Sequence, residues 1–218
     1  MRWMIAPRRL YDFLPSGNGY RVRMALAELE LPFEYVQVDL LRAQSHTPEF
    51  LAKNPAGEIP VLELEDGTYL RESNAILCYL CEGTSLWPSG AVSRARAFQW
   101  MFFEQSNIDR VIGRARFRRR WPNAVATSTA EFERWYEHGY RALSVMEQHL
   151  AQASYFVDDR FGVADITLYA YTHCAEEGGF DLSLFPGLLA WFERVRARPK
   201  HVRIDALPAV TALPPTSP

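Results

Sequence analysis

The fold is decided by the stretch Asn54-Pro55-Ala56-Gly57-Glu58-Ile59-Pro60-Val61-Leu62 and by the Glu72-Ser73 pair that follows it. The run from Ile59 to Leu64 predicts a strand, Glu65-Asp66-Gly67 predicts a hairpin turn, and Thr68 to Arg71 predicts the partner strand. Glu72-Ser73 then opens a predicted helix. This part of the chain therefore predicts a β-hairpin followed directly by a helix.

The residues before this stretch predict a strand, a helix and a second strand. Leu10 to Leu14 is a short apolar run that ends in the loop Pro15-Ser16-Gly17-Asn18-Gly19. A predicted helix follows and ends at Leu31-Pro32, and Phe33 to Leu40 then alternates as a strand does. Pro48 to Lys53 predicts a short helix or turn. This order fits a mixed sheet covered by helices.

From Ser93 onward the pattern of strands ends and the chain predicts helices alone. Helical periodicity occurs in four segments, 95–120, 129–152, 164–177 and 186–198. Proline and glycine between residues 84 and 90 indicate a linker, and a proline-rich end is typical of an extended tail. The predicted domains are residues 8–84 and 93–205, with a flexible tail at 206–218.

Composition narrows the class of protein. The formal net charge is −2, which does not favour nucleic acid or a membrane surface as a partner. No run of about 18 apolar residues is present, so we expect no membrane span. Pro7, Arg8 and Arg9 interrupt the start of the chain, which does not resemble a signal peptide. With three cysteines, an odd number, these features predict reduced thiols and a cytoplasmic location.

The motif from Asn54 to Leu62, followed by Glu72-Ser73, resembles the cytosolic glutathione transferase family, and the resemblance covers almost the whole chain. It implies an α/β thioredoxin-like N-terminal domain with a mixed four-stranded sheet, followed by an all-α C-terminal helical-bundle domain. It also implies glutathione as co-substrate, a small electrophilic or disulfide substrate, a homodimer, a role in detoxification and no metal.

The same resemblance implies where glutathione binds. In the family, the proline before the third strand is cis, which turns the backbone of the preceding residue outward so that an extended peptide can pair with it. A serine at a helix N-terminus suits a carboxylate. We therefore expect the glutathione contacts to be His46, Lys53, Glu58, Ile59, Pro60, Glu72 and Ser73.

The thiol of glutathione is expected at the loop after the first strand. Serine-type members of the family use a hydroxyl there, and Ser16-Gly17-Asn18-Gly19 is similar to the Thr-Pro-Asn-Gly pattern of the Nu-like bacterial branch, which also reduces disulfides. Hydrogen bonds and a helix N-terminus would favour the thiolate. Ser16 and Asn18 both remain candidates for the catalytic contact, although both are also ordinary turn residues. Arg21 could add positive charge nearby.

The second substrate is expected to face the first long helix of the helical part. Phe103, Glu104, Asn107 and Arg114 recur there at three- and four-residue steps, and Tyr11 completes the expected pocket. Aromatic residues at this spacing also suit a core, and Tyr11 lies inside a predicted strand. The arginines from Arg110 to Arg120 predict a solvated or dimer-facing surface, or else a wall that binds anions.

Three further patterns favour structural roles. Gly17 and Gly19 mimic a dinucleotide fingerprint, but Val22 replaces its third glycine. Cys78 and Cys81 have redox spacing but lie inside a predicted helix, where buried small side chains are expected. The segment from Gly162 to Ile166 resembles the family's buried helix start. Gly162 stands where many members have Ser or Thr, which predicts weaker capping.

The resemblance implies an enzyme that stabilises the thiolate of glutathione and directs it at electrophiles or disulfides. The alternative is a non-catalytic, glutathione transferase-like module that binds partners or regulates them. A glutathione-dependent isomerase is a third hypothesis, but the first loop lacks the Ser-Ser-Cys pattern of that branch.

Overall fold

The computed structural model describes residues 5–208, which form two compact units. The first unit comprises the residues up to Gly83 together with the segment that begins at Lys200, and the second runs from Thr84 to Pro199. The predicted boundaries differ at the C-terminal side, because residues 200–208 pack with the first unit. Residues 209–218 of the predicted tail lie outside the described residues.

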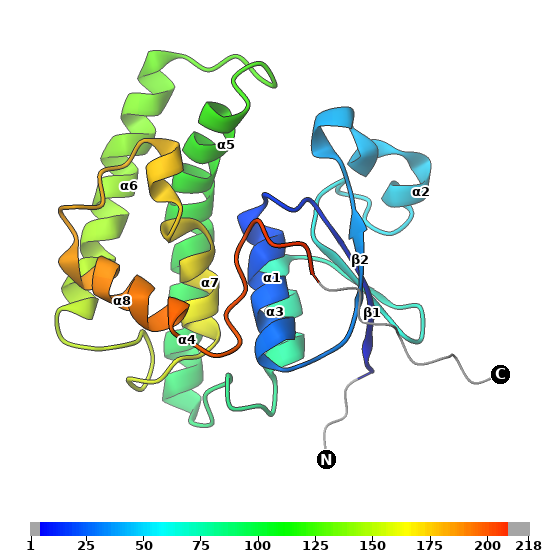
Figure 1. Ribbon diagram of the computed structural model, residues 1–218, viewed down its shortest axis with the longest axis horizontal. Coiled ribbons are helices and arrows are strands. Elements are labelled where there is room, and N and C mark those ends of the chain that lie inside the picture. The colour runs from blue at the N-terminus through cyan, green and yellow to red at the C-terminus, as the bar shows by residue number, and fades with distance from the viewer. Residues whose placement is uncertain (1–4, 209–218) are drawn as a thin grey trace. The chain divides into compact units, whose positions relative to one another are not determined.

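The first unit has a mixed four-stranded sheet in the order β2-β1-β3-β4 (Figure 1). Strands β1 and β2 are parallel, whereas β3 is antiparallel to both β1 and β4. Helices α1 and α3 pack against each other. The elements are β1 (Pro7–Asp12), α1 (Gly17–Glu28), β2 (Glu34–Gln37), α2 (Pro48–Leu51), β3 (Val61–Leu64), β4 (Tyr69–Leu70) and α3 (Ser73–Cys81). The predicted order and the mixed sheet are confirmed.

Alternation along β1 divides its side chains between the two faces of the sheet. Leu10 and Asp12 are fully buried, and Asp12 contacts α1. Tyr11 points to the opposite face, where it packs against a cluster that includes Phe50 of α2 and Val61 of β3. The sheet is therefore covered on both faces.

The C-terminal segment of the first unit is fastened to α1 by polar contacts. The hydroxyl of Tyr20 donates to the carbonyl of Val202 at 2.7 Å, and the Arg23 guanidinium donates to the carbonyl of Ile204 at 3.0 Å. Lys200 forms an ion pair of 2.7 Å with Glu30, just beyond the helix. Hence residues 200–208 are held along α1 and are not an independent tail.

The second unit is helical throughout its named elements, as expected for the all-α part (Figure 1). All ten residues of α7 are buried, so the other helices pack around it. A reciprocal capping box between Ser128 and Glu131 starts α6. The helices are α4 (Ala91–Glu104), a π-helix (Gln105–Gly113), α5 (Arg114–Arg120), α6 (Thr129–Leu150), α7 (Val163–Thr172) and α8 (Pro186–Arg196).

Asp165 caps the start of α7 from inside the core. Its carboxylate accepts hydrogen bonds from the backbone N–H groups of Phe156 and Gly162 and from the indole N–H of Trp191, at 3.3, 3.0 and 3.0 Å. A Cβ on Gly162 would lie 2.9 Å from the backbone oxygen of Leu86. Glycine therefore stands at this position because the Leu86 backbone occupies the space of a side chain.

Candidate functional site

The loop after β1 is closed by the N-cap of α1. The Ser16 hydroxyl accepts a hydrogen bond from the Gly19 N–H at 3.4 Å, which satisfies one N–H group of the first helical turn. A Cβ on Gly19 would lie 1.6 Å from Oδ1 of Asp12, so only glycine fits there. Because Ser16 acts as the acceptor in this contact, its O–H proton remains able to donate elsewhere.

The N-termini of α1 and α3 meet through two side-chain hydrogen bonds. The Ser73 hydroxyl donates to Oδ1 of Asn18 at 3.3 Å, and the Arg21 guanidinium donates to Oδ1 of Asn74 at 3.1 Å. Arg21 is fully buried and Ser73 is only 6% exposed. Two residues predicted for different parts of glutathione, Asn18 and Ser73, are thus in direct contact.

The loop before β3 is organised by the buried side chain of Asn54. Its amide donates to the carbonyl of Glu58 at 2.7 Å, and its Oδ1 accepts from the N–H of Ala56 at 3.1 Å. The Ile59–Pro60 peptide bond that follows is cis. Asn54 therefore shapes the turn that leads into Ile59 and Pro60, a role that the sequence did not reveal.

The remaining predicted glutathione contacts differ in exposure and in their partners. His46 is exposed, yet its ring lies against Gly57, whose added Cβ would be 2.7 Å from Nδ1. The Lys53 ammonium lies over the Tyr11 ring and pairs with Glu49. Glu58 and Glu72 are exposed, and Glu72 has a positive φ of 63°. That conformation is uncommon for glutamate and occurs directly before Ser73.

A buried ion pair supports the loop that carries Ser16. The Arg23 guanidinium donates to Asp12 at 3.1 Å and to the carbonyl of Leu14 at 2.6 Å, two residues before Ser16. Both charged side chains are almost completely buried. Burial raises the pKa of Asp12 to about 7, although Arg23 acts in the opposite direction. One guanidinium thus joins β1, the loop and the C-terminal segment.

Tyr11, expected in the second-substrate pocket, lies on the face of the sheet that carries α2. Its hydroxyl donates to Glu63 at 2.8 Å and its ring packs edge-on against Phe50. Burial and the hydrogen bond to Glu63 both raise the pKa of Tyr11. These contacts favour a structural role for the tyrosine.

The other four residues expected in that pocket do not share one face of the helix. Glu104 is fully buried, whereas Asn107 and Arg114 are exposed and Phe103 is half-buried against Trp100. The spacing argument assumed an α-helix. The segment from Gln105 to Gly113 is instead a π-helix, which has wider turns and rotates later residues around the axis.

The arginines from Arg110 to Arg120 differ in burial, and Arg118 is half-buried. Arg110, Arg114, Arg119 and Arg120 are exposed, as expected for a solvated surface. Arg116 is instead buried and donates to Glu177, which also pairs with Arg120. At least one member of the run is therefore part of the packing in the second unit.

Three other features considered from the sequence are the cysteine pair, metal ligands and a membrane span. Cys78 and Cys81 are free thiols, half-buried and buried, and burial raises the pKa of Cys78. Between residues 5 and 208 no group of His, Cys, Asp and Glu could hold a metal ion. No helix in that range is long and apolar enough to cross a membrane.

Sequence reasoning missed Asp12, Arg23, Asn54 and Asn74. Each is polar and contacts a residue distant in the chain or shapes the loop at Ile59. A buried arginine gives no signal in a periodicity pattern, because every residue from Gly19 to Leu26 of α1 is buried, the two arginines included. Asn54 stood within the motif that decides the fold, but the motif does not say what its amide contacts.

Comparisons with known proteins agree with this fold. Residues 15–82 match the model of the glutathione S-transferase N-terminal domain, and residues 118–199 match that of the C-terminal domain. A glutathione S-transferase from Pseudomonas fluorescens Pf-5 is 46% identical, with a TM-score of 0.87 over 90% of this chain and 98% of that one.

The names of two further relatives indicate a ligand or an activity. A Burkholderia graminis glutathione transferase, solved with two glutathione molecules bound per subunit, is 29% identical, with a TM-score of 0.77 over 88% of this chain and 84% of that one. The disulfide-bond oxidoreductase YfcG of Escherichia coli K12 is 29% identical, over 86% of this chain and 89% of that protein. With both domain models matched and this architecture present, the chain belongs to the glutathione S-transferase family.

Proposed function

We propose that this protein binds glutathione across the N-termini of α1 and α3 and the loop that ends at Pro60. The contact between Asn18 and Ser73 carries the proposal, because it brings the expected thiol site and the expected carboxylate site together. The N–H groups at the start of α3 and the Ser73 hydroxyl bind the γ-glutamyl carboxylate. The backbone of Ile59 pairs with the cysteinyl residue, and His46 and Lys53 contact the glycine carboxylate.

The thiol then lies at the start of α1, where it ionises. The Ser16 hydroxyl and the Asn18 amide donate hydrogen bonds to the sulfur, and the helix N-terminus favours its negative charge. A free thiol has a pKa of about 8.5, and lowering it by two units requires about 2.7 kcal/mol of differential stabilisation. Two hydrogen bonds to an anion together with a helix N-terminus are sufficient for that amount.

The thiolate attacks either an electrophilic carbon or a sulfur of a disulfide. In the second reaction a bond forms between the two sulfurs, the substrate's disulfide breaks, and its other sulfur leaves as a thiolate. A second glutathione then displaces the remaining substrate sulfur and yields oxidised glutathione. Similarity to a disulfide-bond oxidoreductase and to a glutathione transferase supports both reactions. We expect a cytoplasmic homodimer. Of the residues expected near the second substrate, we retain Phe103, Asn107 and Arg114, because Glu104 is fully buried.

The alternative is a non-catalytic module with the same fold that binds or regulates partners. The presence of Ser16, Asn18 and the contact to Ser73 favours the enzyme, because a module would not need a hydrogen-bonded connection between the two parts of the site. Turnover with electrophilic and disulfide substrates separates the two functions.

Calorimetric titration with reduced glutathione tests the binding site. We expect the wild type to bind at micromolar to low-millimolar levels and Ser73→Ala to bind about tenfold more weakly, because a hydrogen bond to a charged group is lost. Ser144→Ala is the matched control, since Ser144 is an exposed helical serine of the second unit. No heat of binding at several millimolar in the wild type would overturn the proposed function.

A further inference from the structure

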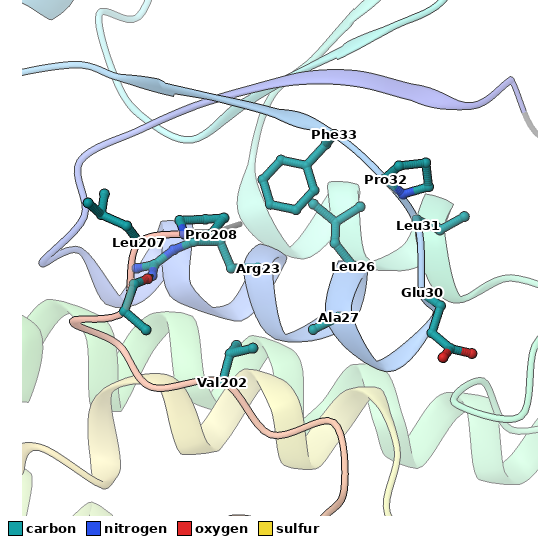
Figure 2. Close-up of a pocket in the computed structure, with 11 residues that line it drawn as sticks. Arg23, Leu26, Ala27, Glu30, Leu31, Pro32, Phe33, Val202, Leu207 and Pro208 are labelled. Carbon is teal, nitrogen blue, oxygen red and sulfur yellow. The ribbon is translucent and has the colours of Figure 1, made fainter. Parts of the chain in front are cut away.

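A pocket of about 530 Å³ in the first unit lies away from Ser16 and Asn18. It runs along the C-terminal half of α1, at Leu26 and Ala27, whereas the proposed thiol site is at the N-terminus of that helix. The turn from Leu31 to Phe33 forms a second wall, and the segment from Val202 to Pro208 forms the third (Figure 2).

The pocket stays open because its third wall is fastened to α1 by hydrogen bonds. Tyr20 holds the carbonyl of Val202, Arg23 holds the carbonyl of Ile204, and Lys200 pairs with Glu30. These contacts fix the backbone of the segment beside the helix, so it cannot collapse against Leu26. A pocket whose walls are held in this way is already formed before a ligand arrives.

Apolar side chains dominate the surface of the pocket. Leu26 and Phe33 are buried in its walls, Val202 borders it, and Leu207 is 71% exposed beside Pro208 at one end (Figure 2). Such exposure of a large apolar side chain at the edge of a concave apolar site is typical of a surface that gains free energy when it is covered.

The two charged residues of the pocket are already paired. The Arg23 guanidinium is occupied by Asp12 and by the carbonyls of Leu14 and Ile204, and the Glu30 carboxylate by Lys200. A charged ligand would therefore lose its hydration without gaining an ion pair. The volume is within the range of about 300–1,000 Å³ that is usual for small-molecule sites.

Because its charged residues are paired and its apolar walls are held by hydrogen bonds, we propose that this pocket binds a small, uncharged, hydrophobic molecule. The site does not involve Ser16, Asn18 or Ser73, so the proposal does not depend on glutathione binding.

Fluorescence titration with N-phenyl-1-naphthylamine, a neutral probe that brightens in apolar surroundings, tests the proposal. The probe can also enter other apolar sites, so variants that fill the pocket from opposite walls identify where it binds. We expect Ala27→Trp and Val202→Trp each to weaken the binding by about tenfold or more. Ala95→Trp, on an exposed surface of α4, should leave it unchanged.

Photolabelling with a neutral aryl diazirine gives a second readout on the unaltered protein. We expect labelled peptides from residues 24–33 or 202–208, with labelling suppressed by the naphthylamine probe and retained in saturating glutathione. Circular dichroism and thermal melting establish that the tryptophan variants are folded. Unchanged probe binding in both folded tryptophan variants, or labels only outside these peptides, would overturn the proposal.

Discussion

Two carboxyl groups, Asp12 in the first unit and Asp165 in the second, are both fully buried, yet their partners differ in kind. Asp12 pairs with a guanidinium that also reaches Leu14 and Ile204. Asp165 accepts hydrogen bonds only from neutral groups, two backbone N–H groups and the indole of Trp191. A long charged partner connects separate segments, whereas neutral donors form a compact helix cap.

The two acids therefore stabilise different kinds of structure. The Asp12–Arg23 pair holds both the loop before Ser16 and the C-terminal segment, so it positions the loop of the candidate site. Asp165 fixes the start of α7 inside the helical unit. Burial raises the pKa of both carboxyls to about 7, so the shift alone does not separate a supporting role from a structural one.

The largest effect on stability is expected when Asp165, which caps α7 through neutral donors, is removed. Asp165→Ala leaves three buried donors without an acceptor and should lower the free energy of unfolding by about 3–5 kcal/mol. Urea denaturation measures this loss. Glu133→Ala, at an exposed acid of the same unit, is the control and should unfold like the wild type. A loss for Asp165→Ala no greater than that of the control would contradict the role of the cap.

A somewhat smaller loss is expected when the charged pair is broken. Arg23→Met leaves Asp12 buried without its cation, and we expect a loss of about 2–4 kcal/mol, since the carboxyl can relieve part of the cost by taking up a proton. In a double-mutant cycle, adding Asp12→Asn should restore part of this stability. Arg203→Met breaks an exposed pair with Asp205 and serves as the control. Strictly additive losses would show that the pair is not coupled.

The pH dependence of the free energy of unfolding tests the protonation of Asp165. Its folded pKa of about 7 exceeds the unfolded value, so between about pH 4 and pH 7 the folded state binds the extra proton. The stabilisation from that proton is present at pH 5 and is lost as the pH rises through 7. Asparagine does not titrate, so the cost of Asp165→Asn should be about 2 kcal/mol larger at pH 5 than at pH 8. Equal costs at both values would mean that the carboxyl stays ionised in the fold.

The smallest effect on stability is expected at Gly162, whose N–H donates to Asp165. Sequence reasoning treats Gly162 as a weakened cap, which predicts that Gly162→Ser stabilises the protein. The structure predicts the reverse, a loss of about 1 kcal/mol, because the new Cβ would press on the Leu86 backbone. Thermal melting decides between them, with Gly90→Ser as the control, where a Cβ meets only the Ser93 side chain at 3.6 Å. A higher melting temperature for Gly162→Ser would contradict the packing argument.

The same comparison shows what the sequence could predict. Asp165 lies within three residues of Gly162, so its cap was readable as a local motif, and the order of strands and helices followed from alternation and turn residues. Arg23 is 181 residues from Ile204, and no local pattern connects them. The π-helix could not be predicted for a related reason, since its wider turn depends on packing and not on the residues of the segment alone.

The motif from Asn54 to Leu62 and the Glu72-Ser73 pair predicted a β-hairpin followed by a helix, and β3, β4 and α3 confirm that order. The hydrogen bond between Ser73 and Asn18 could not be predicted, because it depends on how α1 and α3 pack. The second-substrate residues were chosen by α-helical spacing, which the π-helix does not follow.

The central claim is that the N-terminus of α1 favours the thiolate of bound glutathione. A pH titration of thiolate absorbance at saturating glutathione tests it most directly, with Ser16→Ala and Asn18→Ala measured beside the wild type. We predict a bound thiol pKa about two units below that of free glutathione, and a rise towards the free value in each variant, because each loses one donor to the sulfur. A bound thiol that titrates like free glutathione in the wild type would contradict the account.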